Sequence, residues 1–233
     1  ALEWLYHQVR NREVEIDELV EYFGEAWKAK FGPEIRVTNG GASDAYNKGI
    51  RCLVDYYTKN KPFKQSVVGI EQKIIFQVDS EGKYFIQGFI DRLDKTEVGT
   101  YEVHDYKTNQ VMKSQAEVDA DKQLAFYHIG LQEKYGKDIR VRLVWDFLNF
   151  NERIISNRTQ EQLEKLKTDT LALIKKIESN TLWPSCGKQY CDWCDYKRRN
   201  NATYESVVNN FDNLEKNKVK IFVPDDQSFL FAA

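Results

Sequence analysis

The chain has 233 residues, of which 42% are hydrophobic, which is enough for one sizeable core, so we expect a single domain. Its formal charge of −2 and pI near 6.0 give no overall sign of a nucleic-acid partner, because nucleic-acid-binding domains are often basic. No apolar run approaches the ~20 residues that span a bilayer, and no signal-peptide pattern opens the chain, so we expect a cytoplasmic protein with no membrane partner.

Three helices are predicted in the first quarter of the chain. Apolar residues recur at helical spacing over residues 1–9 and again over residues 16–30, where Gly-Pro follows shortly after the second run. Ser43 is a good N-cap for a third helix that continues to about residue 59. Cys52 lies at the edge of the apolar stripe of that helix, which predicts a buried free thiol.

The pattern changes to β-strands after Pro62. Runs over residues 66–78 and 83–90 are rich in Val, Ile and Phe, and the turn between them predicts a β-hairpin. A further strand over residues 101–107 follows a polar turn at residues 95–99. Glu71 in the first run is a possible extra carboxylate for a site, but we assign it to the surface.

Asp91, Asp105 and Lys107 form the candidate catalytic group on these strands. Side chains two apart on a strand share a face, so Asp105 and Lys107 emerge on the same side of the sheet. Asp91 follows the run that ends at residue 90, and we expect it to join them only where the strands bend or splay. Two carboxylates and a lysine suit a hard divalent cation with a positioned water. An isolated Asp-x-Lys is more commonly a solvated strand face, so its context decides between the two interpretations.

The second half of the chain alternates helix and strand. A helix is predicted over residues 114–135, where Gln123 and Tyr127, four apart, share a face. A strand over residues 139–150 follows, and then Thr159 opens a helix that reaches about residue 178 with a capping box. Strands and helices in this order predict an α/β fold.

Three cysteines, Cys186, Cys191 and Cys194, follow the last predicted helix with C-x₄-C-x₂-C spacing. Structural disulfides are not expected in an intracellular chain, so the three residues are interpreted as thiolate ligands of one metal centre. Three thiolates are too few for either a zinc site or a cubane iron–sulfur cluster, so a fourth ligand is required.

Three motifs, in order, resemble the RecB-like branch of the PD-(D/E)XK nuclease superfamily. Residues 88–94, Gly-Phe-Ile-Asp-Arg-Leu-Asp, resemble its Gly-x-x-Asp strand, and residues 105–108, Asp-Tyr-Lys-Thr, resemble its (D/E)-x-K strand. Residues 123–127, Gln-Leu-Ala-Phe-Tyr, resemble its Gln-x-x-x-Tyr helix. Each motif is short, but the ordered set is specific, and the similarity extends from the first helix to about Lys197.

The resemblance implies a restriction-endonuclease-like αβββαβ core with a mixed sheet, extra N-terminal helices, and a C-terminal helix plus cysteine loop. It implies a nuclease domain over residues 1–200, truncated at its N-terminus, and a C-terminal tail over residues 201–233. RecB-like nucleases usually carry a metal-ligating histidine at the start of the first helix, just before a segment such as residues 1–3. We therefore expect that histidine to lie upstream, and His7 to be an ordinary helix residue.

The implied activity is metal-dependent DNA cleavage, with an exonuclease favoured, in DNA repair, recombination or foreign-DNA processing. The two aspartates and the backbone carbonyl of Tyr106 would bind Mg²⁺ or Mn²⁺, the lysine would act on the attacking water, and the glutamine and tyrosine would contact the DNA backbone. The predicted catalytic residues are thus Asp91, Asp105, Lys107, Gln123 and Tyr127. The alternative is a nuclease-like module that binds DNA, or a helicase or recombination partner, without cutting.

The cysteine cluster also has a counterpart in the family. Iron–sulfur members of the RecB-like group take one cysteine from before the nuclease motifs and three from after them, and the trio here is similar to that closing set. Asn200 stands near the position where the usual spacing often puts the last cysteine. The resemblance favours a 4Fe-4S cluster over Zn²⁺, with a fourth ligand that is either Cys52 or a cysteine upstream of residue 1.

Overall fold

The structure, a computed structural model, describes residues 1–182 apart from residues 34, 36, 38 and 39. Residues 1–167 lie in one compact unit, and residues 168–182 are the described part of a second unit. The three clustered cysteines and the expected tail lie outside the described residues, so what the sequence indicates for them remains a prediction. No helix of the described part of the chain is long and apolar enough to cross a membrane.

The described helices largely follow the predicted ranges. They are α1 (Leu2–Val9), α2 (Ile16–Lys30), α3 (Ala42–Asn60), α4 (Gln115–Ala120), α5 (Gln123–Tyr135) and α6 (Gln160–Ser179), with a 3-10 turn η1 (Leu148–Phe150). The predicted capping box opens α6, because Thr159 N–H donates to the Gln162 side chain and Gln162 N–H donates to the Thr159 hydroxyl. At α3 the expected cap was wrong: Ser43 lies inside the helix, and Gly41 is the N-cap. There the Gly41 N–H donates to the carboxylate of Asp44 at 3.2 Å.

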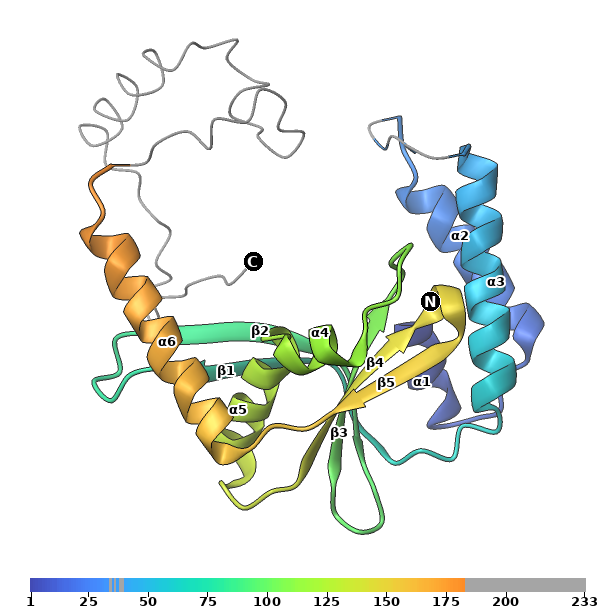
Figure 1. Ribbon diagram of the computed structural model, residues 1–233. Helices are drawn as coiled ribbons and strands as arrows, with labels where there is room; N and C mark the ends of the chain where they lie inside the picture. Colours follow the sequence, from blue (N-terminus) through green and yellow to red (C-terminus); the bar gives the residue numbers. More distant parts are fainter. Residues whose placement is uncertain (34, 36, 38–39, 183–233) are drawn as a thin grey trace. The chain divides into compact units, whose positions relative to one another are not determined.

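Five strands form one mixed sheet in sequence order, β1 to β5. Their bounds are β1 (Val67–Gln77), β2 (Phe85–Lys95), β3 (Tyr101–Lys107), β4 (Val141–Phe147) and β5 (Glu152–Ser156). β3 and β4 run parallel, and the other neighbouring pairs are antiparallel. A parallel pair needs a crossover connection, which α4 and α5 provide (Figure 1). The predicted α/β architecture, with a mixed sheet and additional N-terminal helices, is therefore confirmed.

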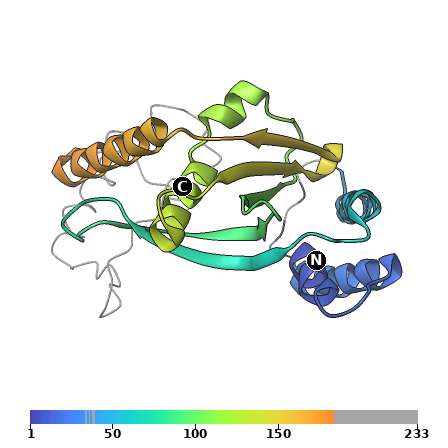
Figure 2. The ribbon, with the colours of Figure 1, turned by 90° about the horizontal axis from the view of Figure 1, so that it is seen from below.

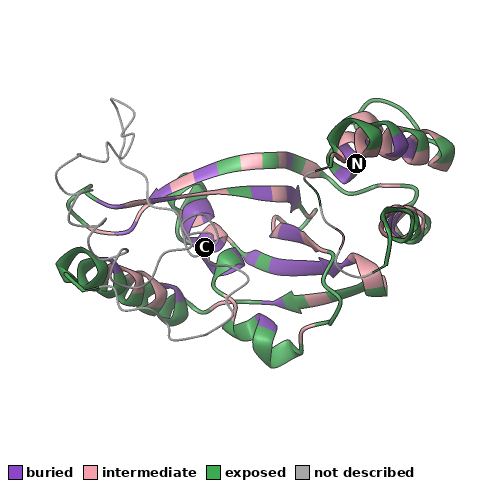
Figure 3. Cartoon of the chain, turned by 90° about the horizontal axis from the view of Figure 1, so that it is seen from above, coloured by how far each residue is buried: buried purple, intermediate pink, exposed green. Residues whose placement is uncertain are grey.

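Two apolar clusters hold this unit together. The larger one lies between α5 and the sheet, where Leu124 and Leu131 of α5 meet Val103, Leu143 and Trp145 without solvent exposure. A second cluster joins α1, α2 and α3 to the start of β1, and Figure 2 shows these helices grouped at one end of the sheet. In Figure 3 the buried residues follow the strands and the inner side of α5, as expected for apolar faces that pack together.

Two predicted elements are divided in the structure. The helix expected over residues 114–135 breaks between α4 and α5, where Lys122 is the N-cap of α5 and the Asp121 carboxylate accepts a hydrogen bond from Gln123 N–H at 2.9 Å. The strand expected over residues 139–150 is only β4, followed by η1 and by Asn151 in the left-handed conformation (φ 49°). Asn tolerates this conformation better than most residues, and it turns the chain into the unpredicted β5.

Candidate active site

The hairpin of β2 and β3 brings Asp91 and Asp105 together. Its ladder pairs Arg92 with His104, so the next opposed positions are Asp91 and Asp105. The backbone ladder ends at Arg92 and His104, and beyond it Asp91 Oδ2 accepts a hydrogen bond from Tyr106 N–H at 2.8 Å. The carboxylate of Asp91 thus takes the place of a backbone acceptor beside Asp105.

Lys107 and Gln123 complete a closed set of contacts around Asp105. Lys107 Nζ lies 2.6 Å from Asp105 Oδ2 and donates to Gln123 Oε1 at 3.0 Å. Gln123 Nε2 donates to Asp105 Oδ1, also at 3.0 Å. Its amide also lies 3.4 Å from the hydroxyl of Tyr127, one turn further along α5. The five residues predicted from the motifs therefore lie in one place.

Gly88 explains how Tyr127 fits so close to the sheet. A Cβ atom at Gly88 would lie 2.5 Å from the Tyr127 ring, closer than real Cβ contacts allow. The glycine of the Gly-x-x-Asp motif therefore leaves room for the tyrosine of the Gln-x-x-x-Tyr motif. Two motifs that are separate in the sequence are in this way joined by packing.

The charges at the site are only partly balanced. Burial raises the pKa of Asp105 to about 6, and the neighbouring carboxylates Asp91 and Asp121 add to the effect, although Lys107 opposes it. Burial also raises the pKa of Asp91, against the hydrogen bond from Tyr106 N–H and the charge of Lys107. Carboxylate and carbonyl oxygens are hard ligands that suit Mg²⁺ or Mn²⁺, so the donor atoms present fit a divalent cation.

Glu71 lies across from Asp91 on β1. The ladder between β1 and β2 pairs Ile70 with Arg92 and Gln72 with Ile90, and leaves out the two acidic residues between them. Glu71 is exposed, as expected of a surface residue. However, burial and then the charge of Asp91 raise its pKa, so the two carboxylates are close enough to repel each other.

The start of α1 reaches the same edge of the site. Burial lowers the pKa of the Ala1 amino group, and the charges of Glu3 and Glu71 raise it, so the N-terminal end of α1 lies near β1. His7, at the other end of α1, is exposed, as expected for an ordinary helix residue.

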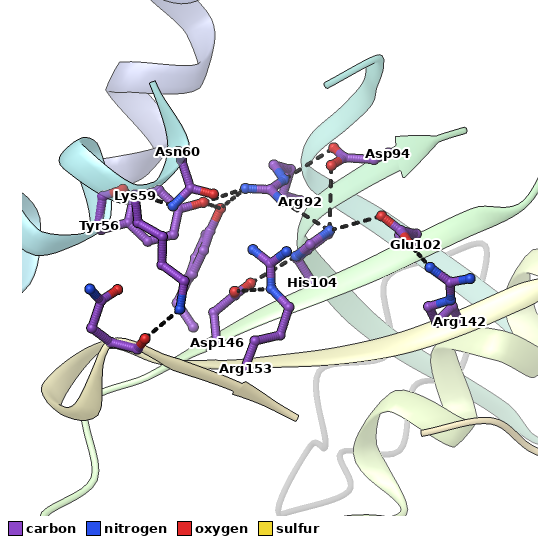
Figure 4. A network of polar contacts seen from close by, with 12 residues as sticks. Tyr56, Lys59, Asn60, Arg92, Asp94, Glu102, His104, Arg142, Asp146 and Arg153 are labelled. Atoms are coloured by element: carbon purple, nitrogen blue, oxygen red, sulfur yellow. Dashed lines mark hydrogen bonds and ion pairs between the residues drawn. The ribbon is translucent and has the colours of Figure 1, made fainter. Parts of the chain in front are cut away.

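A buried polar network on the neighbouring positions of β2 and β3 was not predicted from the sequence (Figure 4). At its centre is Arg92, whose side chain is 1% exposed. Arg92 Nε donates to Asp94 Oδ1 at 3.1 Å, and Nη1 donates to the hydroxyls of Tyr106 (2.7 Å) and Tyr56. The guanidinium also lies over the ring of Tyr6, 4.3 Å from its centroid. Arg92 thereby connects the two strands to α1 and α3.

His104 occupies the other side of this network. Its Nδ1 lies 2.7 Å from Asp146 Oδ2, and its Nε2 lies 3.4 Å from Asp94 Oδ2 and 3.8 Å from Glu102 Oε2. Burial and the charge of Arg92 lower the pKa of His104, but the contacts with these three carboxylates outweigh them and raise it to about 9. The carboxylates therefore favour the protonated ring, although Arg92 opposes it.

Asp94, Glu102 and His104 place ligand atoms within 4.8 Å of one another and could hold a metal ion. Arg92 argues against it, because its Nη2 lies 2.9 Å from His104 Nε2 and would repel a cation there. We therefore interpret the network as a structural ion cluster. The sequence signal was the position of Arg92 and Asp94 on either side of Leu93 in β2, where these three consecutive residues are all buried.

Comparison with protein families agrees with this geometry. A sequence model of the PD-(D/E)XK nuclease superfamily matches residues 1–199, which is most of the chain. A search among curated proteins found no significant match.

Proposed function

The chain belongs to the PD-(D/E)XK nuclease superfamily, whose members generally hydrolyse phosphodiester bonds with divalent metal ions, and from this premise we propose that it is a Mg²⁺- or Mn²⁺-dependent deoxyribonuclease. The observation that carries the proposal is the contact of Lys107 with Asp105 beside Asp91. We further propose that it is a RecB-like exonuclease of DNA repair, recombination or foreign-DNA processing, and that it acts with a helicase or recombination partner. The order of the three motifs supports this finer assignment.

In this proposal Asp91, Asp105 and the Tyr106 carbonyl would hold the metal ion. The bound ion would polarise the scissile phosphate and offset its negative charge. Lys107 Nζ, held between Asp105 and Gln123, would orient or deprotonate the attacking water and stabilise the charge that develops on the phosphate, leaving a 5′-phosphate. Phosphodiester hydrolysis requires mainly that charges and reactants be placed correctly, and each of these residues would supply a charge or hold a reacting group in position.

Gln123 and Tyr127 would contact the DNA backbone near the scissile bond. The hydrogen bonds of Gln123 support a second role, which is to hold the side chains of Asp105 and Lys107 in position from α5. DNA would then approach from the side on which α5 begins.

The test is a cleavage assay with Mn²⁺ on end-labelled single- and double-stranded DNA, paired with calorimetry of Mn²⁺ binding. Lys107→Ala should abolish cleavage and leave metal affinity largely intact, because the lysine acts on water and phosphate. Asp105→Ala should lose both properties.

The two assays also separate the alternatives. If the wild-type chain binds DNA but cuts neither substrate, it is a binding module and the proposed activity is wrong. If Asp105→Ala binds Mn²⁺ as tightly as the wild type, Asp105 is not a ligand.

We also propose that Cys186, Cys191 and Cys194 close a metal site, a 4Fe-4S cluster in preference to Zn²⁺. Cys52 is a weaker candidate for its fourth ligand. It is buried on α3, its Sγ donates to Asn149 Oδ1 at 3.2 Å, and burial raises its pKa, which disfavours the thiolate that a metal requires. These contacts support a packing role for Cys52.

A further inference from the structure

Three acidic residues occupy opposed positions on three neighbouring strands. The register places Glu71 of β1 across from Asp91 of β2, and Asp91 across from Asp105 of β3. We propose that Glu71 is a third carboxylate ligand of the metal site. This inference rests on the proposed function and adds a residue to it.

The spacing of a sheet makes the row compact. Neighbouring strands lie about 4.8 Å apart, so the middle residue, Asp91, is adjacent to both of the others. A side chain as long as that of glutamate can span the distance from β1 to an ion held at Asp91. An ion between Asp91 and Asp105 is therefore within reach of Glu71.

The backbone at Glu71 is unusual and turns the strand at this point. Glu71 has φ 44°, in the left-handed region that residues other than glycine rarely adopt. Before it Gly69 is buried, and after it Ile74 and Phe76 are buried, so the alternation of faces changes between Gly69 and Ile74, in the stretch that contains Glu71. Such irregularities in strands often re-aim a side chain at a functional site.

In the neighbouring strand, β2, the side chains also switch between the faces of the sheet at this position. Ile90 and Leu93, three residues apart on β2, pack into the same apolar cluster, although strict alternation would put them on opposite faces. The irregularity therefore affects Glu71 and Asp91 together and leaves both out of the backbone ladder.

The register places the carboxylate of Glu71 beside that of Asp91, a proposed metal ligand on the next strand. Mutual repulsion of carboxylates is relieved when a divalent ion binds between them. Hard divalent ions also prefer six or more oxygen ligands, more than two carboxylates and one carbonyl supply.

The experiment measures Mn²⁺ binding by calorimetry with the full chain and the Glu71→Gln variant. This substitution keeps the size of an exposed side chain and removes its charge, so folding should be unaffected. We expect affinity to fall by about tenfold or more, since even residues that only support metal ligands are worth 10–100-fold. Glu71→Asp, which keeps the charge on a shorter side chain, should fall between the two. The matched control is Glu81→Gln, because Glu81 is exposed in the turn between β1 and β2 and should not change affinity.

Failure of the Glu71 proposal can be distinguished from failure of the proposed function. If Glu71→Gln binds Mn²⁺ like the wild type while Asp105→Ala does not bind it, Glu71 is no ligand and the proposed nuclease still stands. If the wild-type chain neither binds Mn²⁺ nor cuts DNA, the metal site itself is wrong and the role of Glu71 falls with it.

Discussion

His128 is a buried residue of α5 whose ring nitrogens have no hydrogen-bond partner within the described part of the chain. Burial, with a smaller contribution from the charge of Arg158, lowers its pKa to about 4. The folded protein thus holds the ring neutral, whereas the unfolded chain protonates it below about pH 6.5. The stability associated with neutral His128 is complete above pH 6.5 and is lost as the pH falls towards 4.

Replacing His128 with Leu should therefore make the protein less sensitive to acid. Between pH 7 and pH 4.5 the wild type should lose about 2.5 kcal/mol more stability than the variant, from the two pKa values and the linkage relation. Urea unfolding at both pH values measures the difference. His7→Leu, at an exposed position, is the matched control. Equal acid sensitivity in wild type and His128→Leu would show that His128 titrates normally.

At the level of single residues, the motifs predicted the cluster of Asp91, Asp105 and Lys107 better than they predicted the residues around it. Asp91, Asp105 and Lys107 were identified because their residue types and order match a family pattern. Glu71 was assigned to the surface because no motif includes it, and its position across from Asp91 becomes visible only in the strand register. Pairing across strands depends on bulges and turns that a single sequence does not determine.

Among the elements, Arg92 links β2 and β3 to the helices at the end of the sheet. It touches the hydroxyls of Tyr56 and Tyr106 and the carboxylate of Asp94. Asp94 is 3% exposed, and its Oδ2 has no hydrogen-bond partner within the described residues, only the longer contact with His104 Nε2 at 3.4 Å. Loss of Arg92 would therefore leave a buried carboxylate with less compensation.

Arg92→Leu should destabilise the protein by about 3–5 kcal/mol, the usual cost of breaking a buried ion pair from one side. Arg92→Lys should recover only part of this, because an ammonium cannot contact the carboxylate and both hydroxyls as a planar guanidinium does. Urea unfolding at pH 7 provides the measurement. The exposed pair of Arg12 and Glu18 gives the comparison, since Arg12→Leu should change stability little. A similar small effect for Arg92→Leu would exclude a stabilising role for the network.

Elements with a long periodic pattern were predicted well, and short ones were not. α1, α2 and α6 agree with the sequence because each has a clear apolar stripe and recognisable ends. At the break before α5, Gln123 N–H donates to the Asp121 carboxylate, a local contact inside a sequence whose pattern is otherwise helical. β5 is five residues long, and its partner β4 precedes it through a 3-10 turn, so local pattern alone could not identify it.

For the whole molecule, the cysteine cluster predicts that metal content and stability are linked beyond residue 182. If the three thiolates hold a structural metal, Cys191→Ser should make that region sensitive to protease and leave the Lys107 site unchanged. Protein in which the centre has its full set of ligands, purified without oxygen, should be brown with broad absorption near ~400 nm if the centre is iron–sulfur.

Elemental analysis decides between the interpretations. A colourless protein with bound zinc would establish the zinc alternative. A metal-free protein with unchanged protease resistance in Cys191→Ser would end the metal hypothesis for the cluster.

The opposition of Asp91 and Asp105 across a hairpin has an evolutionary consequence. A hairpin that gains one residue on each strand keeps the same residues opposed, whereas a residue gained on one strand alone displaces one aspartate from the other. The turn at residues 96–100 lies outside the ladder, which ends at Lys95 and Tyr101, so a change in the length of the turn leaves the two aspartates opposed. The number of residues between the two aspartates therefore reports the length of the hairpin and its turn, and is independent of the geometry of the pair.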